Sequence, residues 1–185
     1  MPVREASFPL QGGCACGSIR YQVEAPPLFI HCCHCTDCQR ETGSAFAINK
    51  LIESEHVKIL TGKELQIITI PPDRDPGQQI LRCAKCNVAL RSFYPDHGPF
   101  LSFIRVGTLD QPCVVTPDIH LFVRSKVPWL SLPDGVLKKE ELYDIEEVWP
   151  EQSIMRRKVI LPKVVAYYRE KGNESLKNVP LREGV

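Results

Sequence analysis

The sequence has little of several features that mark whole classes of protein. No apolar run approaches the roughly 20 residues that a helix needs to cross a bilayer, and neither end carries a lipidation motif, so a soluble protein is expected. Internal repeats and low-complexity segments are also absent. With 185 residues, of which 43% are hydrophobic, the chain is long enough for one globular unit with a real core.

An excess of charge of either sign is missing as well. The chain has 23 basic and 22 acidic residues and a net charge of +1, so nothing draws it toward phosphate backbones or anionic membranes. It also has no stripe of interleaved aromatic and basic residues. Nucleic acid and membranes are therefore not expected partners.

The amino terminus lacks an apolar signal core, and the expected location is the reducing cytoplasm. A disulfide framework fits poorly with that location. Nine cysteines are an odd number, and the neighbours Cys32 and Cys33 have α-carbons only about 3.8 Å apart, closer than disulfide geometry prefers.

The cysteines that are present are strongly clustered. Seven of the nine fall into three tight groups, which is too ordered for thiols that only pack in a core. Clustered thiols in a reducing environment are typical of metal sites. The groups are Cys14 with Cys16, then Cys33, Cys35 and Cys38, then Cys83 with Cys86.

The remaining pattern predicts a mainly β fold with short helical turns. Apolar residues alternate in short runs separated by glycine or proline, which is typical of strands. A helical turn is expected from Thr36, whose hydroxyl would cap it, to Gly43. The expected strands lie near residues 19–23, 57–59, 65–67, 79–82, 88–94, 100–106 and 119–123.

The composition changes at about residue 138. We therefore interpret residues 10–137 as the domain and residues 138–185 as a partly helical C-terminal extension that packs on it or trails from it. An acidic stretch precedes the basic run 156–158, and such charge runs usually form a solvated face. Pro162 suits the first turn of a helix that runs to Gly172 along the β body.

Two of the cysteine pairs combine into one four-cysteine site in this interpretation. Cys14 and Cys16 lie among glycines, and a two-residue offset in extended chain puts both sulfurs on one side. Cys83 and Cys86 form a knuckle between two strands. Because zinc prefers four thiolate or imidazole ligands in a tetrahedron, a closed, structural zinc site is predicted. Separate or unmetallated thiols are the alternative.

The middle cysteine group offers three converging sulfurs. If the chain is extended up to residue 35, Cys33 and Cys35 project to one face, and Cys38 returns from the helical turn. Three protein ligands would leave a position open on a zinc ion, the usual mark of a reactive site. Alternatively, Cys113 or a histidine closes the site, although Cys113 is better interpreted as a small buried hydrophobe.

Other residues near these motifs have simpler interpretations. Cys32 and His34 project to the opposite face, where a buried or hydrogen-bonded histidine is expected. His120 faces away from its apolar neighbours and could line a pocket, but a satisfied surface histidine is preferred. Arg124 could pair with a ligand carboxylate, and an exposed arginine is again preferred. Core packing accounts for two aromatic residues, Phe46 and Trp129.

The cysteine motifs and a later segment form one ordered pattern over about residues 10 to 135. It comprises Gly12-Gly13-Cys14-x-Cys16-Gly17, then Cys33-His34-Cys35-x-x-Cys38-x-x-x-x-Gly43-Ser44-x-Phe46, then Cys83-x-x-Cys86, then Pro117-Asp118-Ile119-His120, Arg124-Ser125-Lys126 and Pro128-Trp129. This pattern resembles the glutathione-dependent formaldehyde-activating enzymes, also called the CENP-V/GFA domain. Asn87 stands where the family usually has glycine, but asparagine tolerates positive φ, so the turn is expected to survive.

The resemblance implies a compact Mss4-like, zinc-stabilised β fold with two zinc ions per chain. Family members are commonly carbon-sulfur lyases, and the founding activity interconverts glutathione plus formaldehyde with S-hydroxymethylglutathione. The implied ligands are Cys14, Cys16, Cys83 and Cys86 for a structural zinc, and Cys33, Cys35 and Cys38 for a catalytic zinc.

The expected function is that of a zinc-dependent carbon-sulfur lyase acting on a small-molecule thiol adduct of an aldehyde or related electrophile. Coordination to zinc deprotonates a thiol whose pKa is otherwise about 8.5, which supplies a sulfur nucleophile at neutral pH. Glutathione or another thiol is the expected co-substrate. The alternative is a non-catalytic, zinc-stabilised protein-interaction module. The sequence predicts neither the general acid or base nor the oligomeric state.

Overall fold

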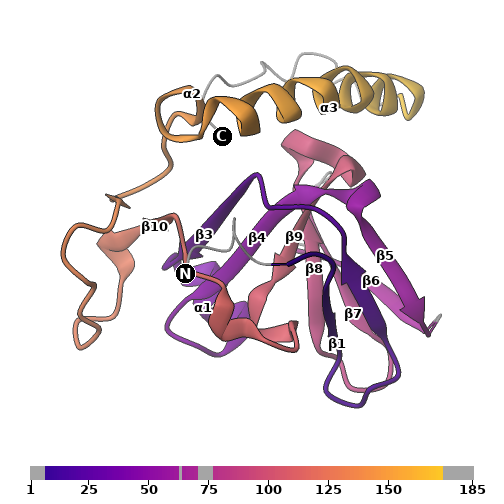
Figure 1. The fold of residues 1–185 in the computed structure, drawn as a ribbon, viewed down its shortest axis with the longest axis horizontal. Helices are drawn as coiled ribbons and strands as arrows, with labels where there is room; N and C mark the ends of the chain where they lie inside the picture. The colour runs from indigo at the N-terminus through magenta and orange to yellow at the C-terminus, as the bar shows by residue number, and fades with distance from the viewer. Residues whose placement is uncertain (1–6, 63, 71–76, 173–185) are drawn as a thin grey trace.

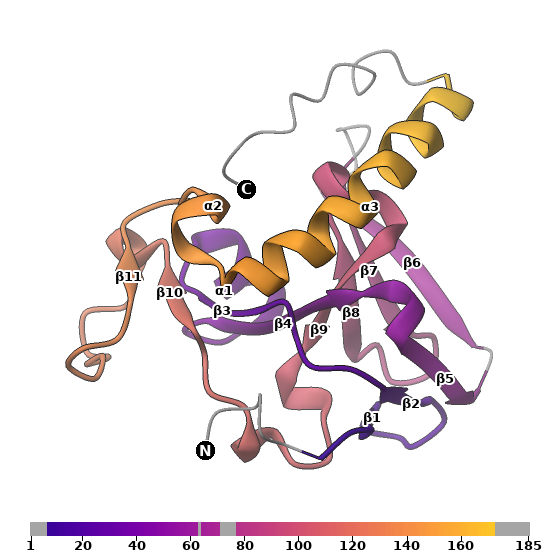
Figure 2. The ribbon, with the colours of Figure 1, turned by 45° about the horizontal axis from the view of Figure 1, so that its top comes forward.

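A computed structural model describes residues 7–62, 64–70 and 77–172, and its fold is mainly β. Eight strands form one sheet in the order β11, β10, β3, β4, β9, β8, β7, β6 (Figures 1 and 2). In this order the strands are β11 (Lys138–Lys139), β10 (Ile119–Leu121), β3 (Phe29–Cys33), β4 (Ala47–Glu53), β9 (Leu101–Arg105), β8 (Ala89–Phe93), β7 (Gln78–Cys83) and β6 (Leu65–Ile70).

A second, smaller sheet contains three strands in the order β1, β2, β5. These strands are β1 (Leu10–Gly13), β2 (Arg20–Val23) and β5 (Val57–Thr61). Within the larger sheet, β10 runs parallel to β3 and β11, and the other pairs are antiparallel. The predicted mainly β fold with short helical turns and a partly helical C-terminal segment is confirmed.

The larger sheet has two faces that differ in character. On one face, called the cavity face here, the register places His31 of β3 opposite Asn49 of β4, and Asn49 opposite Arg105 of β9. Because successive side chains alternate between the faces of a strand, the intervening residues point to the core face. Ile30 and Ile52 lie there in a hydrophobic cluster shared with the smaller sheet.

All seven expected strands have a counterpart, and β4 is the largest element that the pattern missed. Every residue of β4 except Ile48 is buried, including Lys50 and Glu53. A strand that is covered on both faces loses the alternation of apolar and polar residues that reveals strands in a sequence. The charged residues Lys50 and Glu53 further interrupted the apolar run by which a buried strand could be recognised.

Helix α1 (Thr36–Thr42) begins and ends close to the predicted bounds, but its cap is different. The residue at the N-cap is Cys35, whose side chain accepts a hydrogen bond from the backbone of Cys38, so the predicted cap by Thr36 is wrong. Gly43 ends the helix in the left-handed conformation, as expected.

The C-terminal segment contains α2 (Ile145–Val148) and α3 (Glu151–Glu170), and it packs on the cavity face of the sheet (Figures 1 and 2). Ile154, Ile160 and Val164 of α3 are buried there. Pro162 lies inside the helix on its exposed side, so the prediction that the helix begins at Pro162 is wrong. The inward apolar stripe holds the helix together across a residue that lacks a backbone donor.

The basic run in α3 is not the solvated face that its charges predicted. Arg157 is buried, and the Arg156 guanidinium donates to the Glu53 carboxylate and to the carbonyl oxygen of Pro26. Only Lys158 is exposed. Across the described ranges of the chain, no helix has the length and apolar character to cross a membrane.

Candidate metal sites and the adjoining cavity

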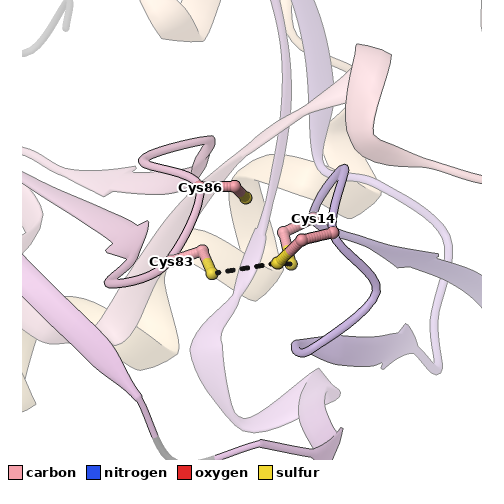
Figure 3. Close-up of side chains that lie close together, drawn as sticks. Cys14, Cys83 and Cys86 are labelled. Carbon is pink, nitrogen blue, oxygen red and sulfur yellow. Dashed lines mark hydrogen bonds between the residues drawn. The ribbon is translucent and has the colours of Figure 1, made fainter.

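Four cysteines from two distant parts of the chain meet where the smaller sheet approaches the β7 to β8 turn. Cys14 and Cys16 follow β1. Cys83 ends β7 and Cys86 lies in the turn, and Figure 3 labels both of these together with Cys14. All four sulfurs lie within 4.8 Å of one another, with 3.4 Å between Cys14 and Cys16 and 3.8 Å between Cys16 and Cys83. Tetrahedral zinc with Zn–S bonds of about 2.3 Å separates its sulfurs by about 3.8 Å. These residues therefore could hold a metal ion.

Local backbone geometry prepares both halves of this four-cysteine group. Gly17 adopts a φ of 73° in the turn after Cys16, and the backbone N–H of Ile19 donates to the Cys14 sulfur over 3.3 Å. Asn87 adopts a φ of 59°, so the prediction that asparagine would preserve the knuckle is confirmed. The turns at both ends thus need residues that tolerate left-handed backbone conformations.

Three further cysteines meet at the start of α1. Cys33 ends β3, Cys35 caps the helix, and Cys38 lies in its first turn. Their sulfurs lie within 4.8 Å of one another, with 3.5 Å between those of Cys33 and Cys35. The Cys38 N–H donates to the Cys35 sulfur over 3.3 Å, and the neighbouring thiols and this N–H lower the pKa of Cys35. This donor set also could hold a metal ion, and Cys113 is exposed and outside it.

A third group lies on the core face behind the three cysteines. The His34 Nε2 atom lies 3.0 Å from Nδ1 of His120 and 3.6 Å from the Cys32 sulfur. The predicted alternation is therefore confirmed for Cys32 and His34, and the expectation of a hydrogen-bonded His34 is confirmed. His120 is half-buried and stacks on His34, so its interpretation as a surface residue is wrong. Burial lowers the pKa of both histidines, to about 4 for His34, so each imidazole is neutral and the pair can share one hydrogen bond.

A cavity of about 330 Å³ opens beside the three-cysteine group on the cavity face. Strands β3, β4, β9 and β10 form its floor, and α1, the β8 to β9 connection and the C-terminal segment form its walls. Besides the three cysteines, its lining is His31, Asp37, Glu41, Asn49, Leu51, Gln78, Tyr94, Asp96, His97, Phe103, Arg105, Leu121, Phe122, Leu142, Tyr143 and Trp149.

Tyr94 presents a hydroxyl group to this cavity. The Gln78 side-chain amide donates to the Tyr94 hydroxyl oxygen over 2.9 Å, which leaves the hydroxyl hydrogen free to be donated elsewhere. Burial raises the pKa of Tyr94, and the nearby cysteines raise it further, so the phenol remains protonated. His97 lines the same cavity as a neutral imidazole, because burial lowers its pKa to about 3.

An ion-pair cluster fixes α1 against the sheet. The Glu41 carboxylate accepts bonds of 2.5 Å from both Arg82 and Arg105, and Arg105 also donates to the Asn49 side chain over 2.7 Å. The side chains of Glu41 and Arg105 are each 8% exposed. A buried pair of this kind is costly to break, because one charge is left unpaired. The cluster thereby holds the helix that carries Cys38 in place.

A second cavity, of about 470 Å³, lies on the other side of this cluster. It is the larger of the two, and Cys86 lines it, but none of the three-cysteine group does. The smaller cavity is therefore the one that adjoins a cysteine group with only three members.

The C-terminal segment supplies one wall of the smaller cavity. The Trp149 indole N–H donates to the Tyr143 hydroxyl over 2.7 Å, and that hydroxyl lies 2.5 Å from Nε2 of His31 in β3. Burial lowers the pKa of His31 to about 3, so its Nε2 can accept the Tyr143 hydrogen. The Trp149 ring also stacks on Phe29, with centroids 5.5 Å apart. These contacts hold the C-terminal wall of the cavity against strand β3 in its floor.

Several residues of interest lie elsewhere than the sequence predicted. Cys113 is exposed, so its interpretation as a buried hydrophobe is wrong, and Trp129 is 75% exposed rather than in the core. By contrast, Arg124 is exposed, as expected, and pairs with Glu141. Phe46 is half-buried against the His34 ring.

Sequence reasoning did not single out most of the polar cavity lining. His31, Tyr94 and His97 come from a strand and a connection with no motif. Tyr143 and Trp149 lie in the acidic stretch, where charge concealed an apolar pattern that includes Ile145 and was available in the sequence. The missed signal was an amphipathic segment inside a charged one.

Comparison with known proteins places these features in a family. The family model for "Glutathione-dependent formaldehyde-activating enzyme" matches residues 9–125. The chain belongs to this family. The match includes both cysteine groups and ends before the segment that carries Leu142, Tyr143 and Trp149. The family resemblance of the sequence is therefore confirmed.

Two relatives of this chain carry the name "Putative glutathione-dependent formaldehyde-activating enzyme". One, from Halomonas elongata, is 27% identical over 128 residues, which cover 66% of this chain and 80% of the relative. The other, from Colletotrichum graminicola, is 32% identical over 124 residues, which cover 63% of this chain and 62% of the relative. A crystal structure of a Rhodobacter sphaeroides protein matches with a TM-score of 0.44 and 19% identity, over 55% of this chain and 88% of that one.

Proposed function

We propose that this protein is a zinc-dependent carbon-sulfur lyase that cleaves or forms the thiol adduct of an aldehyde, with glutathione or a similar thiol as the sulfur carrier. One observation carries the proposal: three cysteine sulfurs converge beside a cavity of about 330 Å³, and no fourth histidine or cysteine ligand joins them within the described ranges. The family assignment, and the names of the two relatives, agree with this chemistry.

The two cysteine groups suit different uses of zinc. Four sulfurs complete a tetrahedron, so we assign Cys14, Cys16, Cys83 and Cys86 to a structural zinc. We assign Cys33, Cys35 and Cys38 to a second zinc. When bound there, zinc would supply a site that favours the thiolate form of a sulfur ligand over the thiol form.

The protein side chains then have to position the rest of the adduct. In the cleavage direction, the carbon-sulfur bond breaks, the carbinol hydroxyl loses its proton as the carbonyl forms, and the sulfur leaves and takes up a proton. We propose that the Tyr94 hydroxyl, which accepts a hydrogen bond from Gln78, donates a hydrogen bond to the reacting oxygen; the position of Tyr94 in the cavity lining supports this role. The Glu41 and Arg105 pair keeps α1, and with it Cys38, in a fixed position.

Substitution of Cys35 by serine tests this proposal against a matched control. We expect Cys35→Ser to lower the rate of adduct cleavage by at least about a hundredfold and to remove one of two zinc ions, measured by mass spectrometry of the products and by metal analysis. Cys113→Ser, at an exposed cysteine outside every group, should change neither. Unchanged turnover in Cys35→Ser would contradict the proposal.

The rival function is a zinc-stabilised interaction module. A module of that kind needs two inert zinc ions and no turnover with any thiol adduct. A fully zinc-loaded protein that cleaves no adduct in a screen of glutathione with different aldehydes would favour the module.

A further inference from the structure

The residues that line the smaller cavity indicate which part of an adduct the cavity accommodates. We propose that the aldehyde-derived group is bulky and apolar, an aromatic or branched aliphatic group rather than the hydrogens of formaldehyde. This inference rests on the proposed lyase function and names its substrate class.

The size of the cavity is the first argument. A volume of about 330 Å³ is at the lower end of the roughly 300–1,000 Å³ of small-molecule sites. The group that formaldehyde contributes to an adduct has two heavy atoms, so with the glutathione backbone outside the cavity most of this space would stay unfilled. Empty space beside a reacting group gives no contacts that could orient the adduct.

The second argument is the chemistry of the walls. A cluster of apolar and aromatic side chains faces the cavity, and it comprises Leu51, Phe103, Leu121, Phe122, Leu142, Tyr143 and Trp149. The glutathione backbone carries two carboxylates and an ammonium group, so it gains little from such walls. Because the two carboxylates outnumber the one ammonium group, the acidic residues Asp37 and Asp96, which also line the cavity, would on balance repel this part of the adduct. The apolar wall therefore fits the group on the aldehyde carbon.

Phe122 brings one aromatic ring directly to the three-cysteine group. It packs against Cys33 and Cys38 and lines the cavity. Its backbone has a φ of 54°, in the left-handed region that bulky residues rarely adopt and that costs about 1–3 kcal/mol. Strain of this size is retained where the surrounding structure holds the residue in place, and here the strained residue is an aromatic one packed on the three-cysteine group.

The opposite wall of the cavity is formed by residues outside the region that the family model matches. Leu142, Tyr143 and Trp149 lie beyond residue 125, where the family match ends. Tyr143 is fixed by Trp149 and His31, so this wall is ordered before any ligand arrives. Leu142 is 49% exposed, which places it at the rim of the cavity, where an entering group would contact it first.

Binding of two stable thioether analogues tests the inference without turnover. The chain has two tryptophans, so Trp129→Phe, at an exposed site, leaves Trp149 as the reporter in the cavity wall. In zinc-loaded protein, quenching of Trp149 fluorescence should give S-benzylglutathione a Kd at least about tenfold below that of S-methylglutathione. Equal affinities would overturn the inference.

A substitution that fills the rim supplies the matched comparison. Leu142→Trp should raise the Kd of S-benzylglutathione by at least about tenfold. The Kd of S-methylglutathione should stay within about threefold of its original value. Leu60→Trp makes the same change at an exposed leucine of β5 and should alter neither affinity. Because the introduced indole would itself fluoresce, isothermal calorimetry replaces quenching for these variants. Equal losses for both ligands in Leu142→Trp would overturn the inference.

Turnover separates this inference from the proposed function. Glutathione adducts of benzaldehyde and of formaldehyde are incubated with zinc-loaded protein, and free aldehyde is followed by mass. Cleavage of the formaldehyde adduct alone, with equal analogue affinities, would contradict the inference and support the lyase. Tighter binding of S-benzylglutathione with cleavage of neither adduct would support the cavity preference and contradict the lyase.

Discussion

The two faces of the eight-stranded sheet use cysteine in different ways. On the core face, Cys14 and Cys83 pack in one hydrophobic cluster with Ile30 and Ile52, and four sulfurs surround a common point. On the cavity face, the sulfurs of the three-cysteine group adjoin the smaller cavity, of about 330 Å³. Under the proposed function, the four-cysteine group would hold a zinc ion closed to other ligands, and the three-cysteine group would hold one with a position open to substrate. The number of converging sulfurs, together with the packing around them, makes the difference.

Loss of a ligand from the four-cysteine group should have the largest effect on stability. Structural zinc can supply about 10–16 kcal/mol, so we expect Cys83→Ser to lower the free energy of unfolding by at least about 3 kcal/mol and the melting temperature by about 10 °C. Thermal unfolding followed by circular dichroism measures this. Cys35→Ser should lower the melting temperature less, because its group joins one strand end to the adjacent helix. If Cys35→Ser proved the more destabilising of the two, the division between structural and reactive sites would be wrong.

Removal of the Tyr94 hydroxyl should act on turnover and leave the fold intact. We expect Tyr94→Phe to reduce kcat/KM for adduct cleavage about a hundredfold, the typical cost of losing one donor to a developing charge, with little change in the melting temperature. Tyr167→Phe, in α3 and outside the cavity lining, is the control and should retain full activity. Equal activity in the two variants would remove Tyr94 from the mechanism.

The core face also contains a buried lysine, which gives a pH-dependent prediction. Lys50 is fully buried, its Nζ atom has no hydrogen-bond partner in the described part of the chain, and burial lowers its pKa from 10.5 to about 7. Between these pH values the unfolded chain binds a proton that the folded chain lacks, so this group makes the fold more stable as pH rises. Below pH 7 the cost of the buried charge is fully present.

Lys50→Met should therefore stabilise the protein most at low pH. We expect a gain of roughly 2 kcal/mol in the free energy of unfolding at pH 6, shrinking toward pH 9. Urea unfolding at both pH values measures it, and Lys158→Met, at an exposed lysine of α3, should show no such dependence. A gain that is the same at both pH values would mean that Lys50 is not neutralised by burial.

The sequence predicted the arrangement within each tight cysteine group well, because that geometry is local. Alternation along a strand placed Cys33 on one face and Cys32 on the other, and the structure agrees. Asn87 was predicted to accept positive φ from its chemistry alone, which is confirmed. Such features depend on neighbours within a few residues. The assignment of zinc to either group stays a prediction.

The cavity could not be predicted in the same way because its walls come from distant segments. His31 and Tyr143 are 112 residues apart in the sequence and meet only through the packing of the C-terminal segment on β3. Pro162 appeared to begin a helix, because the tertiary contacts that carry α3 past it are not visible locally. Burial on both sides likewise concealed β4.

Sulfur coordination of the bound zinc tests the central claim most directly. X-ray absorption at the zinc edge of the fully loaded protein gives the average number of sulfur ligands per ion, before and after addition of glutathione. If one zinc ion has four cysteine ligands and the other has three cysteines and an open position, this average should rise when glutathione is added. The rise should be absent in Cys35→Ser. An average of four sulfurs per zinc before glutathione, with no change on its addition, would contradict an open three-cysteine site.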